Sequence, residues 1–120
     1  MNNFTKNALK ENIEFSYTKK GEIKILISPG YGAGWSTWNS DSINLAVDKR
    51  IVDFFELNGK NIEMQQLIDF LKNIGYEDVY VGGWWDIVIK TVKPNDRFII
   101  NEYDGSESLI SFSKDNVWEL

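Results

Sequence analysis

Hydrophobic and polar residues alternate near the start of the chain in a way that predicts a pair of β-strands. In residues 13–17, apolar or aromatic side chains alternate with polar ones, and a period of two is typical of a half-buried strand. Residues 23–28 are more continuously apolar, and the polar residues 19–22 between these segments include a glycine suited to a turn. We therefore expect a β-hairpin that ends at Pro29, because proline has no N–H to donate to a sheet. Residues 1–11 are polar and mixed, and we expect a loose start there.

Two segments with the periodicity of a helix follow. The apolar positions of the first recur at the spacing of one helix face: Val47, Ile51, Phe54 and Phe55. Its other face carries charged residues: Asp48, Lys49, Arg50, Asp53 and Glu56. The second segment has a longer apolar face: Met64, Leu67, Ile68, Leu71 and Ile74. We expect the first helix to end at Asn58-Gly59, and the second to run from a cap at Asn61 to a stop at Gly75.

The period of two returns after the second helix and predicts four further strands. They are expected at residues 79–81, 85–91, 98–103 and 109–112. The dipeptide Asp104-Gly105 between the last two is a strong signal for a hairpin turn. The chain is thus predicted to have an α+β fold of order ββ-αα-ββββ. In it, a mainly antiparallel sheet of about five to six strands carries two helices packed on one face.

The length and composition of the chain limit the classes of protein it can belong to. At 120 residues and 13.9 kDa, it is expected to form a single domain, residues 1–120. It has no cysteine and no histidine, which excludes disulfides and removes the commonest zinc ligand and general base. We therefore expect no metal and no cofactor. We also expect a cytoplasmic protein without a membrane partner, because neither a signal peptide nor an apolar run of roughly 20 residues is visible.

The charge of the chain bears on its partners. The formal net charge is −5, and Arg50 and Arg97 are its two arginines. Binding to duplex nucleic acid needs clustered lysine and arginine, so we expect no direct contact with it. A basic protein surface is a more natural partner for an acidic domain. The alternative is that the charge only keeps a small protein in solution.

Residues 28–40, which we call the glycine loop, have the most unusual composition in the chain. The sequence Ser-Pro-Gly-Tyr-Gly-Ala-Gly-Trp-Ser-Thr-Trp-Asn-Ser combines glycines, which allow close approach to the backbone, with aromatic rings. It matches neither a Walker loop nor a dinucleotide-binding loop, although its amides can form a concave anion site. We predict one wall of a binding site, with these candidate residues: Tyr31, Gly32, Gly34, Trp35 and Trp38. The alternative is a wide turn whose tryptophans plug the end of the sheet.

Two later segments share this chemistry. In Gly82-Gly83-Trp84-Trp85-Asp86, the two rings face opposite ways if the segment is a strand, so one is expected on an exposed face. The alternative is a bulge that turns both inward. Residues 101–108 carry several carboxylates at a hairpin tip, among them the candidates Glu102 and Asp104. We consider three interpretations of these carboxylates: an acidic edge that recognises a basic partner, a solvated hairpin tip, or a glycosidase-like carboxylate pair with Asp86. Candidates from the first segment are Trp84, Trp85 and Asp86.

Three segments of the chain resemble a known group of proteins: GYGAGWSTWN, GGWWD and FIINEYDGSESL. They are similar to segments of small uncharacterised proteins carried by phages and prophages of Gram-positive bacteria, over roughly residues 22–112. The resemblance carries no catalytic residue with it. It implies a context, that of small phage accessory proteins in the cytosol of the host cell, which often counter host defence by binding.

These observations lead to several functional hypotheses. The first is a binding protein without catalytic residues that blocks a host effector, such as a CRISPR nuclease, through its acidic surface and exposed tryptophans. A second form of it sequesters a small nucleotide-type signal in a pocket lined by glycine and tryptophan. The alternatives are a small hydrolase that uses Asp86, Glu102 or Asp104, and a structural protein that forms a homo-oligomer. All of these sites require that residues 28–40, 82–86 and 101–108 meet in space.

Overall fold

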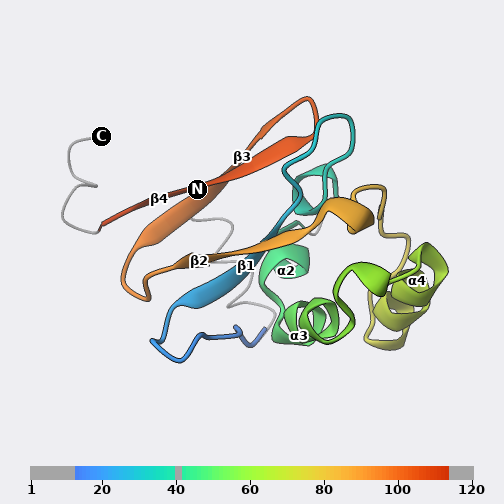
Figure 1. Cartoon of the computed structure of the whole chain (residues 1–120), viewed down its shortest axis with the longest axis horizontal. Helices are drawn as coiled ribbons and strands as arrows, with labels where there is room; N and C mark the ends of the chain where they lie inside the picture. Colours follow the sequence, from blue (N-terminus) through green and yellow to red (C-terminus); the bar gives the residue numbers. More distant parts are fainter. Residues whose placement is uncertain (1–12, 40–41, 114–120) are drawn as a thin grey trace.

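Strand β1 (Ile23–Ile27) pairs with β2 (Val88–Val92) near the middle of the molecule (Figure 1). The computed structural model describes residues 13–39 and 42–113. The two strands are antiparallel, with Ile23 opposite Val92 and Ile27 opposite Val88. β1 ends just before Ser28 and Pro29, as the sequence predicts.

A second antiparallel pair consists of β3 (Arg97–Tyr103) and β4 (Ser106–Phe112). The hairpin predicted at Asp104-Gly105 is confirmed, and both residues have positive φ, 50° and 85°, as a tight hairpin turn requires. The backbone N–H of Glu107 donates to the carbonyl of Ser28 at 2.9 Å. β4 therefore lies beside the residue that follows β1.

The coarse α+β class is confirmed, but the predicted single sheet of about five to six strands is wrong. The described residues form two sheets of two strands each. Residues 13–18 contribute only an isolated bridge between Tyr17 and Ile23. Residues 79–81 form no strand, because the side chain of Asn39 binds both the N–H of Tyr80, at 2.8 Å, and its carbonyl, at 3.0 Å. A side chain from the glycine loop thus takes the place of a strand partner.

The first predicted helix is two helices, α2 (Ser42–Val47) and α3 (Lys49–Asn58). The chain turns at Asp48, which has extended backbone angles and accepts a hydrogen bond from the N–H of Arg50 at 2.9 Å. Asp48 was predicted to lie on the exposed face but is buried, because its carboxylate also accepts from the hydroxyl of Tyr76 at 2.8 Å and from the Arg50 guanidinium at 2.6 Å. Burial and the bond to Asp48 raise the pKa of Tyr76 above its ordinary value.

The second predicted helix is α4 (Met64–Asn73). Its cap is Glu63 rather than Asn61, which lies in a short 3-10 turn, η2 (Gly59–Asn61). The predicted stop at Gly75 is confirmed: the N–H of Tyr76 donates to the carbonyl of Leu71 at 2.8 Å and closes the last turn.

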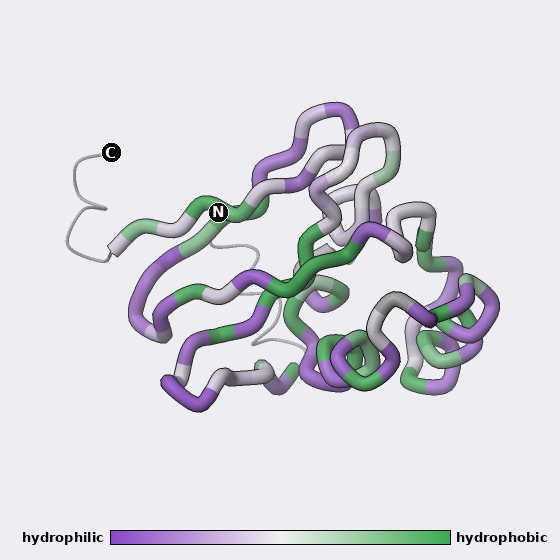
Figure 2. Tube along the Cα trace, viewed as in Figure 1, coloured by the Kyte–Doolittle hydropathy of each residue, from purple (hydrophilic) through white to green (hydrophobic). Residues whose placement is uncertain are grey.

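The side chains of β1 enter two packed groups on opposite sides of the strand. Leu26 joins the group formed mainly by α3 and α4, whereas Ile25 and Ile27 join a group that includes Val47 and Val92. In Figure 1 the β1–β2 pair runs between the β3–β4 hairpin and helices α3 and α4. Figure 2 shows a strongly hydrophobic stretch along β1 and the start of β2. β1 is therefore the strand around which both groups are buried.

Candidate functional site

The three segments singled out in the sequence meet in space. The N–H of Gly30 donates to the carboxylate of Asp86, and the N–H of Gly32 donates to the carbonyl of Asp104 at 2.6 Å. The hydroxyl of Ser106 donates to the carbonyl of Pro29 at 2.7 Å. Figure 1 shows the glycine loop and the turn of the β3–β4 hairpin side by side. The loop is therefore held from two sides by the segments that share its chemistry.

Glu107 is the residue that fixes the inner side of the glycine loop. Only 1% of it is exposed, and its carboxylate accepts from the N–H groups of Ser28 at 3.0 Å, Trp35 at 2.8 Å and Thr37 at 3.0 Å. The hydroxyl of Thr37 donates to it as well. No ion pair of Glu107 is found among the described residues. Because a buried carboxylate is tolerated only when donors surround it, these bonds fix the loop and the carboxylate together.

Sequence reasoning missed Glu107, because acidic residues near a hairpin tip are usually solvated. The alternation of residues in β4 does indicate that Glu107 points inward, because Glu107 lies on the same face of the strand as the apolar Leu109. Leu109 packs against the second hydrophobic group, and its partner across the hairpin is Ile100, which packs there as well. The inward direction of Glu107 follows from this pattern, whereas its partners in the glycine loop do not.

Five backbone amides of the glycine loop are bound by other segments of the protein. The N–H of Gly30 donates to the carboxylate of Asp86, and the N–H of Gly32 donates to the carbonyl of Asp104. The carboxylate of Glu107 accepts from three further N–H groups, those of Ser28, Trp35 and Thr37. An anionic ligand at these five amides would have to displace the carboxylates of Asp86 and Glu107 and the carbonyl of Asp104. These amides are therefore already used within the protein.

Trp35 is a correction to the predicted wall of the site. Its side chain is fully buried, its indole N–H donates to the carbonyl of Leu45 at 3.0 Å, and its ring meets Phe55 edge to face at 6.0 Å. The ring belongs to the hydrophobic group that also contains Leu26 of β1 and Phe55 of α3. It does not line a surface site.

Trp38, Tyr80 and Glu102 together form what we call the aromatic–acidic surface. The rings of Trp38 and Tyr80 lie with centroids 5.3 Å apart at 41°, and they remain 40% and 38% exposed. The indole N–H of Trp38 donates to Oε2 of Glu102 at 3.1 Å, and the N–H of Gly105 donates to the same oxygen at 2.8 Å. The bond from Gly105, and then that from Trp38, holds the pKa of Glu102 below its ordinary value.

The glycines beneath the two rings explain how this surface is held. A Cβ added at Gly34 would lie 2.7 Å from the ring of Trp38, and one added at Gly82 would overlap the hydroxyl of Tyr80. The rings therefore lie directly on backbone that only glycine leaves open. The close approach predicted for Gly34 is made by the protein's own tryptophan. Gly82, which lies against Tyr80 in the same way, was not among the candidate residues predicted from the sequence.

The remaining candidates of the loop lie at its tip. Tyr31 and Gly32 are exposed, and the bond from Gly32 brings this tip against the hairpin turn. The side chain of Asp104 is exposed there and has no hydrogen-bond or ion-pair partner among the described residues. Tyr103, beside it in the hairpin, is a further exposed ring. The tip thus adds aromatic and acidic groups next to Glu102.

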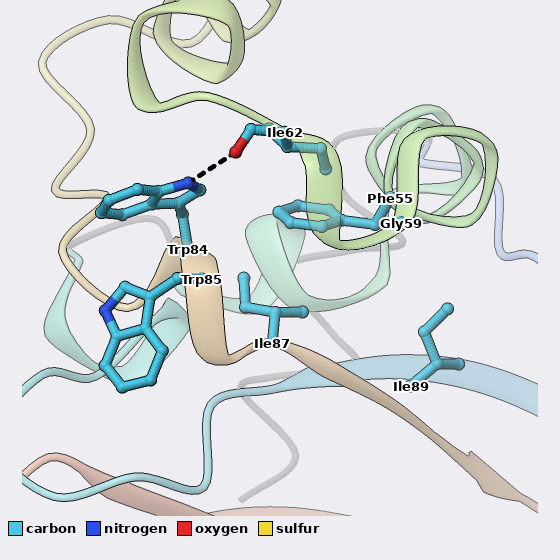
Figure 3. A pocket seen from close by; sticks show the side chains of 7 residues that line it. All are labelled: Phe55, Gly59, Ile62, Trp84, Trp85, Ile87 and Ile89. Carbon is cyan, nitrogen blue, oxygen red and sulfur yellow. Dashed lines mark hydrogen bonds between the residues drawn. The ribbon is translucent and has the colours of Figure 1, made fainter.

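Trp84 and Trp85 lie in a 3-10 turn, η3 (Trp84–Asp86). The strand predicted to begin at Trp85 begins only at Val88. The indole N–H of Trp84 donates to the carbonyl of Ile62 at 2.9 Å, whereas Trp85 is 62% exposed (Figure 3). With apolar neighbours they line a cavity of about 200 Å³: Phe55, Gly59, Ile62, Ile87 and Ile89. We call this the Trp84–Trp85 cavity. It shares no residue with the aromatic–acidic surface and contains no charged side chain.

Two of the three carboxylates considered for catalysis, those of Asp86 and Glu102, have structural contacts. Asp86 accepts hydrogen bonds from Gly30 and, at 3.4 Å, from the hydroxyl of Ser28. The lowered pKa of Glu102 is opposite to what a general acid needs near neutral pH. In the part of the chain that the structure describes, no group of three or more acidic side chains is placed to hold a metal ion. Within the same part, no helix is long and apolar enough to cross a membrane.

Comparisons with known proteins assign no family to this chain. Searches against protein-family models, curated proteins and solved structures gave no match to this chain.

Proposed function

We propose that this chain is a binding protein without catalytic residues, and that its aromatic–acidic surface docks onto a basic surface of another protein. The observation that carries the proposal is the pair of exposed rings, Trp38 and Tyr80, fixed beside an ionised carboxylate, Glu102. Aromatic anchors of this kind supply most of the binding energy in many protein interfaces.

The surface is organised before any partner arrives. Trp38 is held by its indole bond to Glu102 and by the backbone of Gly34 beneath it. Tyr80 is held through its backbone by Asn39. Because these side chains are already ordered, little conformational entropy is lost when they bind.

Charge favours a basic partner. The ion pairs of the described residues join Lys24 to Glu56, Lys49 to Asp53 and Arg50 to Asp48. None of them involves Glu102 or Asp104 of the β3–β4 hairpin. Together with the net charge of −5, these unpaired carboxylates give the surface a negative field. Such a field speeds association with basic proteins and disfavours acidic ones.

The other hypotheses have weaker support. Sequestration of a nucleotide-type signal needs donors for its phosphates, and five amides of the glycine loop already bind Asp86, Asp104 and Glu107. A hydrolase needs a carboxyl that is protonated near neutral pH, and Glu102 has a lowered pKa. We propose a host defence effector, such as a CRISPR nuclease, as the basic partner. The resemblance to phage proteins is the only support for this type of partner.

The proposal can be tested by affinity capture from a lysate of a Gram-positive bacterium. Immobilised wild-type protein is compared with a Trp38→Ala/Tyr80→Ala double variant whose fold is verified by circular dichroism. Asp96→Asn, at the opposite end of β3 from Glu102, is the control for an acidic residue elsewhere on the surface. We expect wild type and control to retain a basic protein that the double variant loses. Equal retention by the double variant would contradict the proposal.

A further inference from the structure

We infer that the aromatic–acidic surface receives an arginine side chain of the partner, with its guanidinium on the exposed rings and a hydrogen bond to Oε1 of Glu102. This inference rests on the proposed function and names the residue type that the surface recognises. It follows from the geometry of Glu102, from the chemistry of the two rings and from the charge around them.

The two oxygens of Glu102 differ. Oε2 accepts hydrogen bonds from Trp38 and Gly105, whereas Oε1 has no partner among the described residues. Because Oε2 is held by two donors, the direction in which Oε1 points is fixed. The bonds from Gly105 and Trp38 also hold the pKa of this carboxyl below its ordinary value, so they favour its ionised form. A partner therefore meets an oriented negative oxygen, and its natural ligand is a cationic N–H donor.

The rings select among cations. The indole N–H of Trp38 donates to the same carboxylate, and Trp38 and Tyr80 both remain partly exposed, so a cation that reaches Oε1 lies beside this pair of rings. Trp is the most favourable ring for a cation within about 6 Å of its centroid. A guanidinium is planar and weakly hydrated, and it can lie flat on a ring while its edge donates hydrogen bonds. A lysine ammonium is more strongly hydrated and cannot stack in this way.

Charge excludes the opposite class of ligand. The exposed carboxylate of Asp104 lies in the same hairpin turn, next to the loop tip that carries Tyr31. A phosphate or an acidic peptide would be repelled by Glu102 and Asp104 together. A neutral side chain would bind the rings but leave Oε1 without a donor. Arginine is the side chain that satisfies both parts of the surface.

The test uses three short peptides that differ at one position: acetyl-Gly-Gly-Xaa-Gly-Gly-amide, with arginine, lysine or citrulline. Citrulline keeps the shape of arginine but has no charge. Each peptide is titrated into the ¹⁵N-labelled full-length protein, and the indole N–H of Trp38 and the amide of Gly105 are followed by NMR. We expect the arginine peptide to shift both signals, the lysine peptide to bind more weakly, and the citrulline peptide to bind about tenfold more weakly.

Variants complete the test. Glu102→Gln should reduce the preference for arginine over citrulline, because the rings remain but the charge is lost, whereas Asp96→Asn should keep the full preference. If Glu102→Gln disturbs the position of Trp38, Trp38→Phe provides a second measurement. It keeps a ring and the carboxylate, and it should retain the preference for arginine.

Equal affinities for arginine and citrulline, or shifts that spare Trp38 and Gly105, would overturn the inference. If capture of a basic protein still depends on Trp38 and Tyr80 in that case, the proposed function stands and only the arginine assignment fails. If arginine binds as expected but the double variant captures the same proteins as wild type, the proposed function fails instead.

Discussion

Glu102 and Glu107 lie directly opposite each other across the β3–β4 hairpin, and they have different tasks. Both accept a hydrogen bond from a tryptophan of the glycine loop: Glu107 from the backbone of Trp35, and Glu102 from the indole of Trp38. Glu107 is buried and surrounded by donors, whereas Glu102 is exposed and has one oxygen without a partner among the described residues. The inner carboxylate holds the loop, and the outer one is available to bind.

The tryptophans show the same division. Trp35 and Trp38 are three positions apart in one loop, yet the first is fully buried in the core and the second is partly exposed on the surface. The loop therefore has a folding side, with Trp35 and Glu107, and a binding side, with Trp38 and Glu102. Residues of one type within a few positions can thus have opposite roles, and their exposure separates them.

The largest expected effect is on the folding side, at Trp35. Trp35→Ala should lower the free energy of unfolding by about 3–5 kcal/mol, because it leaves a cavity in the core. Trp38→Ala should lower it by only about 1–2 kcal/mol, since part of that ring is already in water. Chemical denaturation of both variants measures the difference. Similar losses for the two would remove the distinction between the two sides.

The next effect compares the carboxylates. Glu107→Ala should lower the free energy of unfolding by about 3 kcal/mol or more, because it leaves the buried N–H groups of Ser28 and Trp35 and the partly buried one of Thr37 without an acceptor. Glu102→Ala should leave stability close to wild type, as its side chain is exposed. Urea denaturation under identical conditions tests this. A Glu107→Ala protein as stable as Glu102→Ala would show that Glu107 does not hold the loop.

The smallest effect concerns the ionisation of Glu102. Its pKa should lie below the ordinary value, because Gly105 and, to a lesser extent, Trp38 donate to the charged form. Its contribution to stability is therefore present above the unfolded-state pKa and lost as the pH falls through the folded-state pKa. Trp38→Phe removes the indole donor and should raise the pKa part of the way back, since the bond from Gly105 remains. Carboxyl-carbon NMR across an acid titration measures this, and an unchanged pKa in Trp38→Phe would exclude the indole bond in solution.

Local patterns predicted much of the fold. The Asp104-Gly105 turn, the strand that ends before Pro29, and the helix that stops before Gly75 are each encoded by neighbouring residues. The features that sequence reasoning missed depend on distant partners. Asp48 interrupts a helical pattern because Tyr76 and Arg50 bind its carboxylate.

In the candidate site, too, local sequence predicted some features, whereas others depend on distant partners. The glycine and tryptophan content identified the loop, and the acidic turn identified Glu102, from composition alone. Periodicity could not separate Trp35 from Trp38, since their loop has no regular alternation. Nor could it show that Asn39 replaces a strand partner for Tyr80, because that contact joins segments 41 positions apart.

The most direct test of the division between the two sides is the affinity of Glu102→Gln for the basic protein that the wild type retains. Isothermal titration calorimetry would compare it with wild type and with Asp96→Asn, alongside their free energies of unfolding. We expect Glu102→Gln to bind about tenfold more weakly while it folds as stably as wild type, and Asp96→Asn to match wild type in both measurements. Equal affinity of Glu102→Gln and wild type would contradict the assignment of Glu102 to the binding side.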